Sequence, residues 1–247
     1  MRSNALYTDL SHYYDLMCAD IDYQAQSHTV LRLNQMFGNG GRAHVDLACG
    51  TGPHLEHFIR QGFTSHGLDI NQPMLDLAAK RCPQAQFSQG DMCTFTLTEP
   101  VDLITCFLYS VHYSATLERL AKCFEHSFNA LNPGGVLCFN AVDKNHINNA
   151  SFTQHSIAHA GSTLTFRSGW QYAGVGDAQT LRLSVEKQSE ELLERWEDEH
   201  PMVAVGFAML QKSLEKHFAV HVFSHDYDKL EQWDGQAGNA IFVCVKH

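Results

Sequence analysis

The sequence predicts an α/β fold, a sandwich built on a mostly parallel seven-stranded sheet with an antiparallel β insert. Two observations carry this prediction. Short apolar strands alternate with helical segments from residue 43 to residue 142, and such alternation builds a parallel sheet with helices on both faces. In residues 151–199, stretches rich in Phe, Thr, Leu and Trp are separated by glycines, which is typical of antiparallel strands.

A helical cap over residues 1–40 is expected to precede the sheet. Apolar side chains recur at helical spacing through residues 7–37, beginning with Tyr7 and Leu10. The glycine-rich run 38–41 then ends the helical stretch.

Strands and helices alternate after this cap. They are, in order, strand 43–48, helix 53–61, strand 64–69, helix 73–82, strand 85–89, strand 101–107, helix 115–131 and strand 136–142. Pro73 suits the first turn of its helix, where it has no N–H to lose, and the turn-forming run 132–135 ends another.

The alternation stops at residue 143. We expect residues 143–200 to form an antiparallel β lid inserted between the fifth core strand and a last helix, 206–217. Strands 219–226 and 240–246 would then close the sheet as a hairpin-like pair. The whole chain, 1–247, is expected to form a single domain.

The composition is that of a globular, cytoplasmic protein. Its 247 residues are 44% hydrophobic, which is enough for one large domain with a sizeable core. No apolar run is long enough to span a bilayer, and the first residues lack the apolar stretch of a signal peptide. The eight cysteines are scattered without a C-x-x-C pair, which indicates buried thiols in a reducing compartment.

The charge excludes one class of partner. The formal net charge is −10 with histidine neutral, and no cluster of Lys and Arg offsets it, so a polyphosphate backbone would be repelled. No set of His and Cys residues has the spacing of a metal site. We therefore expect a small-molecule substrate, no nucleic acid, no membrane and no metal, and a homodimer is left open.

Segment 44–54 is the most informative part of the chain, because a buried strand there runs into a glycine turn and then a helix. Gly50 and Gly52 allow backbone angles that a side chain would disfavour, so a ligand can lie against bare main chain. Parallel sheets hold nucleotide-like ligands at such strand ends. The segment is not a Walker loop, since no Gly-Lys-Ser/Thr follows, and Leu55 stands where a dinucleotide motif has its third glycine.

Acidic residues follow at the ends of the next two strands. Asp69 lies about 20 residues past the loop, where such folds place a ribose-binding carboxylate. Asp91 follows the third strand in the run 89–92.

These three elements resemble the motifs of class I S-adenosyl-L-methionine (SAM)-dependent methyltransferases, over roughly residues 40–145 and the two terminal strands. Within that family, segment 50–58 looks most like bacterial small-molecule N-methyltransferases that dimethylate amino sugars. The resemblance implies a Rossmann-like fold, SAM as cofactor and methyl transfer to a small molecule, at an amine.

The resemblance also assigns residues to the methionine end of SAM. Ala48, Gly50 and Gly52 would contact it through the backbone. Phe107 would lie beside the sulfonium, and Tyr14 would close over the carboxylate.

At the adenosine end, the resemblance implies that Asp69 holds both ribose hydroxyls. Ile70 and Met74 would sandwich adenine. Asp91 would accept a hydrogen bond from the adenine amino group, with the Met92 N–H on the ring.

Three residues are candidates for the chemistry itself. An amine must be neutral to attack, so a nearby base helps, and His112 is the first candidate because it follows the fourth strand. Its alternative role is that of a hydrogen-bonded loop histidine. Asn140, at the end of the fifth strand, is expected to orient the substrate. Trp170 and Tyr172 share a strand face and would either cover the sulfonium or pack the insert on the core.

A second resemblance leaves another chemistry open. Segments 10–15, 139–143 and 168–172 look like those of enzymes of this fold that cyclise SAM to azetidine-2-carboxylic acid and release methylthioadenosine. In that case Asn140 and Tyr172 would hold the strained conformer. A third alternative is a SAM-binding module without catalysis.

Overall fold

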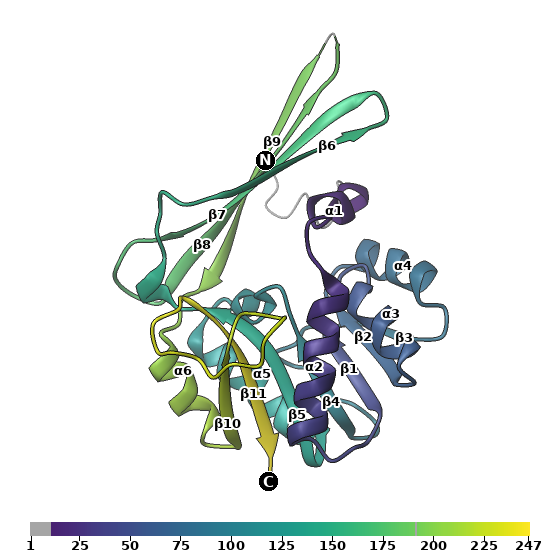
Figure 1. The fold of residues 1–247 in the computed structure, drawn as a ribbon, viewed down its shortest axis with the longest axis vertical. Coiled ribbons are helices and arrows are strands. Elements are labelled where there is room, and N and C mark those ends of the chain that lie inside the picture. Colours follow the sequence, from purple (N-terminus) through teal and green to yellow (C-terminus); the bar gives the residue numbers. More distant parts are fainter. Residues whose placement is uncertain (1–10, 191) are drawn as a thin grey trace.

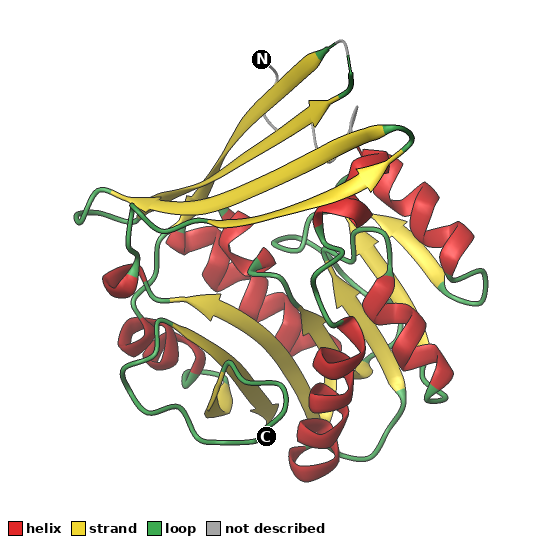
Figure 2. Cartoon of the chain, turned by 45° about the horizontal axis from the view of Figure 1, so that its top comes forward, coloured by secondary structure: helices red, strands yellow, loops and turns green. Residues whose placement is uncertain are grey.

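The computed structural model describes residues 11–190 and 192–247 (Figure 1). The periodic positions Tyr7 and Leu10 lie outside these residues. Figures 1 and 2 show an α/β core with a long, separate antiparallel sheet above it. The predicted α/β fold with an antiparallel insert is confirmed.

The core is a seven-stranded sheet of order β10-β11-β5-β4-β1-β2-β3. The strands are β1 (Ala43–Leu47), β2 (Thr64–Asp69), β3 (Gln86–Gln89), β4 (Val101–Cys106), β5 (Leu131–Val142), β10 (Phe218–Ser224) and β11 (Asn239–Lys246). The first five pair in parallel, and β11 runs antiparallel to both β5 and β10. The carboxyl ends of β1, β2 and β4 therefore meet at one edge, as ligand binding in such folds requires.

Helices cover both faces of this sheet (Figure 1). They are α1 (Ser11–Met17), α2 (Tyr23–Phe37), α3 (Pro53–Arg60), α4 (Gln72–Arg81), α5 (Leu117–Ala130) and α6 (Phe207–Leu214), with 3₁₀ turns η2 (Ser110–Ser114) and η3 (Lys144–His146). The core between α5 and the sheet is aromatic, since Phe139 stacks on Phe124 at 5.4 Å and on Phe242 at 5.1 Å between ring centroids.

Two sequence-based boundaries were wrong for local reasons. The segment predicted to be helical over 7–37 is, in its described part, two helices, α1 and α2, and the Asp22 carboxylate accepts the N–H of Ala25 at 2.8 Å where the second one starts. Strand β5 begins at Leu131 and not at 136. The run 132–135 enters the strand directly and shifts its register against β4, where a turn was expected.

The insert is a four-stranded antiparallel sheet of order β6-β7-β8-β9. Its strands are β6 (Thr153–His159), β7 (Ser162–Tyr172), β8 (Ala178–Gln188) and β9 (Leu193–Val203). One face buries Leu164, Phe166 and Val185 against α1 residues that include Tyr13 and Tyr14. The insert and the N-terminal helix are therefore packed together above the strand ends.

All eight cysteines are buried thiols. Within residues 11–190 and 192–247, no helix combines the length and apolarity needed to cross a bilayer.

Candidate binding site at the strand ends

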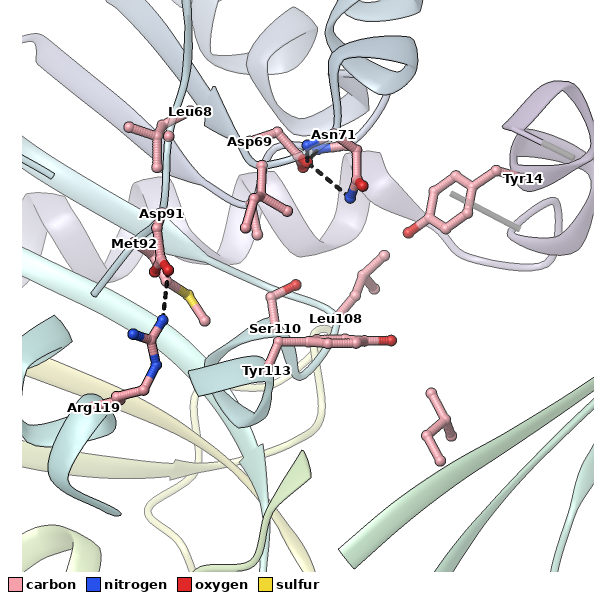
Figure 3. Close-up of a pocket in the computed structure, with 15 residues that line it drawn as sticks. Tyr14, Leu68, Asp69, Asn71, Asp91, Met92, Leu108, Ser110, Tyr113 and Arg119 are labelled. Atoms are coloured by element: carbon pink, nitrogen blue, oxygen red, sulfur yellow. Dashed lines mark hydrogen bonds and ion pairs between the residues drawn. The ribbon is translucent and has the colours of Figure 1, made fainter. Parts of the chain in front are cut away.

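A pocket opens at the carboxyl ends of β1, β2 and β4 (Figure 3). It is lined by Tyr14, Ala48, Gly50, Leu68, Asp69, Ile70, Asn71, Gly90, Asp91, Met92, Leu108, Ser110, Tyr113, Arg119 and Leu181. The walls come from the core, from α1, from the loop before α5 and, through Leu181, from the insert.

The glycine loop after β1 forms the floor of this pocket. Gly50 has φ 55°, and a Cβ built on it would lie 3.8 Å from both the Met74 Cε and the Tyr14 Cε1. Gly52 has φ 81°, and a Cβ there would come within 3.2 Å of Ala78 on α4. Both positions favour glycine because both have a positive φ. At Gly52, a side chain would in addition crowd Ala78 on α4, whereas Gly50 faces the pocket.

Asp69 is held at the end of β2 by backbone donors. Its Oδ2 accepts the N–H of Gly50 at 2.9 Å, and its Oδ1 accepts the N–H of Asn71 at 2.8 Å. Burial raises the pKa of this carboxyl, although these N–H donors act in the opposite direction. The side chain is fixed in place and lines the pocket, where its oxygens can accept hydrogen bonds from the hydroxyl groups of a ligand.

Asp91 lies across the pocket in an ion pair that the sequence did not indicate. Its Oδ1 accepts the N–H of Cys93 at 2.8 Å, and its Oδ2 lies 2.5 Å from the Arg119 guanidinium (Figure 3). Burial acts to raise the pKa of Asp91, but these two donors outweigh it and the pKa is lowered. The carboxylate is thus charged at neutral pH.

A second, smaller cavity adjoins the first behind the glycine loop. The two share Tyr14, Ala48, Gly50, Leu108 and Ser110, and the second adds Tyr23, Asp46, Cys49, Thr51, Pro53, His54 and Phe107. A ligand with two ends can therefore lie across the glycine loop.

His54 is buried beside this second cavity as a neutral imidazole. Burial, with a smaller effect of His57, lowers its pKa to about 3. Its Nδ1 is hydrogen-bonded to the Ser27 hydroxyl at 3.1 Å, whereas its Nε2 is buried with no hydrogen-bond partner among the described residues. Such an orphaned polar atom fits a site that a polar ligand completes.

Asp46 is a buried carboxyl at the end of β1. Its Oδ1 accepts the Thr105 hydroxyl at 2.6 Å. Burial raises its pKa to about 7, against the hydrogen bond from Thr105 and with a further contribution from Asp69. The group is therefore partly protonated at neutral pH.

Helix α1 is tied to the glycine loop by a small polar network. The Thr51 hydroxyl donates to the Asp15 carboxylate at 2.5 Å, and Arg81 donates to the Thr51 carbonyl at 2.9 Å. Arg81 also pairs with Asp15 at 2.5 Å. The network holds Tyr14, the neighbour of Asp15, against the pocket.

The structure brings most of the predicted cofactor-binding residues to this pocket. Those that line it are Tyr14, Ala48, Gly50, Asp69, Ile70, Asp91 and Met92. Phe107 lines the second cavity, where its ring lies 5.3 Å from that of His54. Gly52 and Met74 line neither cavity, and Met74 is buried beneath Gly50.

The three candidates for the chemistry lie outside both cavities. His112 is fully buried, its Nδ1 donates to the Val203 carbonyl at 2.9 Å, and its Nε2 accepts the N–H of Val142 at 3.1 Å. Burial lowers its pKa to about 4. Both ring nitrogens of His112 are in hydrogen bonds with the backbone. This geometry fits a structural histidine, the alternative to a catalytic base.

Asn140 and Tyr172 are likewise engaged within the protein. The Asn140 Oδ1 accepts the N–H of Tyr109 at 2.9 Å, and its Nδ2 donates to His225 at 3.0 Å. The Tyr172 hydroxyl donates to the Gly176 carbonyl at 2.9 Å, near the root of the insert. Asn140 thus positions the loop before α5, and Tyr172 orders a turn of the insert.

Several pocket residues were not predicted. Arg119 and Leu181 carry no motif, because each reaches the pocket only through the packing of α5 or of the insert against the strand ends. The acid at Asp91 is the one signal that could have suggested a cationic neighbour such as Arg119.

Comparison with known proteins agrees with this geometry. Residues 45–135 match the protein-family model described as a methyltransferase domain. The dTDP-3-amino-3,4,6-trideoxy-alpha-D-glucopyranose N,N-dimethyltransferase of Streptomyces venezuelae is 35% identical over 116 residues, which are 47% of this chain and 49% of that protein. The chain spans about half the length of the curated relatives it matches.

Solved structures match over nearly the whole chain. The crystal structure of Streptomyces venezuelae DesVI has a TM-score of 0.83 at 24% identity and covers 97% of this chain and 99% of that one. SAM-bound CalS10, an amino pentose methyltransferase from Micromonospora echinaspora, has a TM-score of 0.82 at 18% identity, with coverage of 96% and 97%. The predicted resemblance and the class I methyltransferase fold are confirmed.

The buried Asp46 generates a prediction on stability. Its folded-state pKa lies above the ordinary value, so its contribution to stability is fully present below about pH 4 and is lost as the pH rises through about 7. The variant Asp46→Asn keeps an oxygen for Thr105 but does not ionise. We expect its free energy of unfolding, relative to that of the unsubstituted protein, to be about 2 kcal/mol higher at pH 8 than at pH 5, so the variant is relatively more stable at pH 8. Urea titrations at both pH values measure this, and an equal difference at both would contradict it.

Proposed function

We propose that this chain transfers a methyl group from SAM to the amino group of a small molecule, with an amino sugar as the favoured acceptor. The observation that carries the proposal is the two-part pocket around the glycine loop, with Asp69 on one side and the buried polar atoms of His54 and Asp46 on the other. The amino-sugar acceptor is supported by the relatives, which are N,N-dimethyltransferases of dTDP-linked amino deoxysugars.

The part of the larger cavity that Asp69, Ile70 and Asp91 line fits an adenosine. Asp69 would accept hydrogen bonds from the ribose hydroxyls, and the exposed Ile70 side chain would pack against the base. Asp91, held by Arg119, lies at the far wall as an acceptor for an amino group. When bound, SAM supplies a methyl group on a positively charged sulfur, which is a good leaving group.

The residues of the smaller cavity fit an amino acid. The unpartnered Nε2 of His54 and the partly protonated Asp46 offer polar contacts there, and the Gly50 backbone lies between the two cavities. The protein's main task is alignment of nucleophile, carbon and sulfur, because the leaving group needs no acid to depart.

The insert and the N-terminal helix act as covers in this proposal. Residues 143–200 form a lid, since Leu181 of β8 lines the pocket from above. Of the cap expected over residues 1–40, the described part, residues 11–40, is tied to the glycine loop through Asp15 and Thr51. Cyclisation of SAM is less well supported, because Asn140 and Tyr172 are occupied outside the pocket.

Binding of SAM should depend on Asp69. Removing a charged acceptor for the ribose hydroxyls is expected to cost about 1.5–3 kcal/mol, so Asp69→Ala should bind SAM at least tenfold more weakly by calorimetry. Asp76→Ala is the control, because Asp76 lies on the exposed side of α4, outside the pocket, and accepts a hydrogen bond from Gln72. Unchanged SAM affinity in Asp69→Ala would refute the site assignment.

Product analysis separates methyl transfer from cyclisation. With SAM alone, we expect almost no turnover, because methyl transfer requires an acceptor. Addition of a dTDP-linked amino deoxysugar should yield S-adenosylhomocysteine and an N-methylated sugar, identified by mass spectrometry. Enzyme-dependent methylthioadenosine from SAM alone, well above spontaneous decay, would favour cyclisation instead.

The lid makes a separate prediction. If residues 143–200 close over the ligand, SAM should slow backbone hydrogen exchange both in the insert and at residues 46–54. Mass spectrometry with and without SAM measures this. Strong protection at 46–54 with none in the insert would mean that the insert does not cover the ligand.

A further inference from the structure

A line of three side chains runs from the pocket into the insert. Tyr113 of η2 lines the pocket, and its hydroxyl lies 2.5 Å from the Nδ1 of His200 on β9. The Nε2 of His200 lies 3.1 Å from the Asp198 carboxylate on the same strand. Figure 3 shows the Tyr113 ring reaching across the pocket wall toward the insert. These residues belong to no motif identified in the sequence.

We propose that Tyr113, His200 and Asp198 form a proton relay that removes a proton from the acceptor's ammonium group. The inference rests on the proposed N-methyl transfer. Tyr113 is the catalytic residue, since it alone borders the pocket, and His200 and Asp198 are positioning residues that act through it.

The function of the relay depends on the tautomer of His200. The relay requires that the Tyr113 hydroxyl donates to Nδ1, 2.5 Å away, and that the imidazole proton lies on Nε2. The Asp198 Oδ2 lies 3.1 Å from Nε2 and is an ion-pair partner for the ring once it is protonated. A carboxylate in this place orients the ring and stabilises the imidazolium that forms when Nδ1 takes a proton.

The proton and electron balance of the step is complete. The ammonium proton passes to the Tyr113 oxygen while that oxygen releases its own proton to His200 Nδ1. The freed nitrogen lone pair forms the C–N bond as the C–S bond breaks, and the C–S electron pair stays on sulfur as a neutral thioether. The product amine carries the positive charge that the sulfur had. His200 then returns its proton to solvent, to which the Asp198 side chain is 10% exposed.

Several neighbouring ionisable groups are already engaged with other partners. His112 of η2 has both ring nitrogens in backbone hydrogen bonds. Tyr13 and Tyr14 of α1 pack on the same face of the insert. Arg182 of β8 and Glu199 of β9 pair with each other at 2.8 Å, and strand alternation places them on the opposite face of the sheet. Across the pocket, Asp69 is held by N–H donors and Asp91 by Arg119.

Kinetics of Tyr113→Phe and Asp198→Asn test the relay. At pH 7, with saturating SAM and the amino-sugar acceptor, we expect kcat to fall about 10²-fold in Tyr113→Phe and less in Asp198→Asn. The loss should shrink toward pH 9, where the amine loses its proton unaided. The SAM dissociation constant and the melting temperature should stay unchanged. Glu199→Gln is the matched control, because it lies next to both positioning residues but on the other face of β9.

A second readout does not depend on turnover. In ¹⁵N-histidine-labelled protein, the His200 resonance, assigned by its loss in His200→Gln, should be that of a neutral ring protonated at Nε2. A ring protonated at Nδ1, or a kcat at pH 7 in Tyr113→Phe equal to that of the unsubstituted protein, would overturn the relay. If the unsubstituted protein methylates no amine while still binding SAM, the proposed function fails, and the resonance still decides whether the relay has the required tautomer.

Discussion

The Asp69 carboxylate is the interaction on which the site depends. It receives the N–H of Gly50 from the loop after β1 and the N–H of Asn71 from the turn before α4, and so joins two neighbouring strand ends through one side chain. A buried carboxylate is costly unless it is hydrogen-bonded, and these two donors offset that cost. The same contact holds the Gly50 backbone at a positive φ, where the absence of a side chain leaves room for a ligand.

Burial of ionisable groups gives the two ends of the pocket different electrostatic characters. At the larger cavity, Asp91 stays charged because Arg119 and a backbone N–H stabilise the anion. At the smaller cavity, Asp46 has no cationic partner among the described residues and takes up a proton near neutrality because it is buried, and His54 remains uncharged. The neutral base of a bound ligand would contact the charged Asp91 at the larger cavity. Its amino-acid end would contact the polar, mostly uncharged Asp46 and His54 at the smaller cavity.

Much of this arrangement was predictable from the sequence, because it depends on local pattern. Strand β2 was predicted at its observed bounds, and the glycine loop and Asp69 follow from residues close together in the chain. The missed features depend on tertiary contacts. Asp91 meets Arg119 across 28 residues, and Tyr113 meets His200 across 87, through the folding back of an insert whose packing no periodicity indicates. The break before α2 was missed for another reason, since the capping side chain Asp22 lies where a second helix starts within a segment predicted to be helical as a whole.

The residues expected to act on the substrate connect the insert to the core. His112 binds the N–H of Val142, where the chain leaves the core sheet for the insert, and the carbonyl of Val203, where the insert ends. Asp143 reinforces this junction, because its carboxylate accepts the N–H of Asn145 and its backbone pairs with Val205. Asn140 holds the loop that carries Tyr113 by accepting the N–H of Tyr109. In the proposed relay, these polar residues contribute without contacting the ligand. They fix the loop that carries Tyr113 relative to β9, and this placement allows the Tyr113 hydroxyl to contact His200.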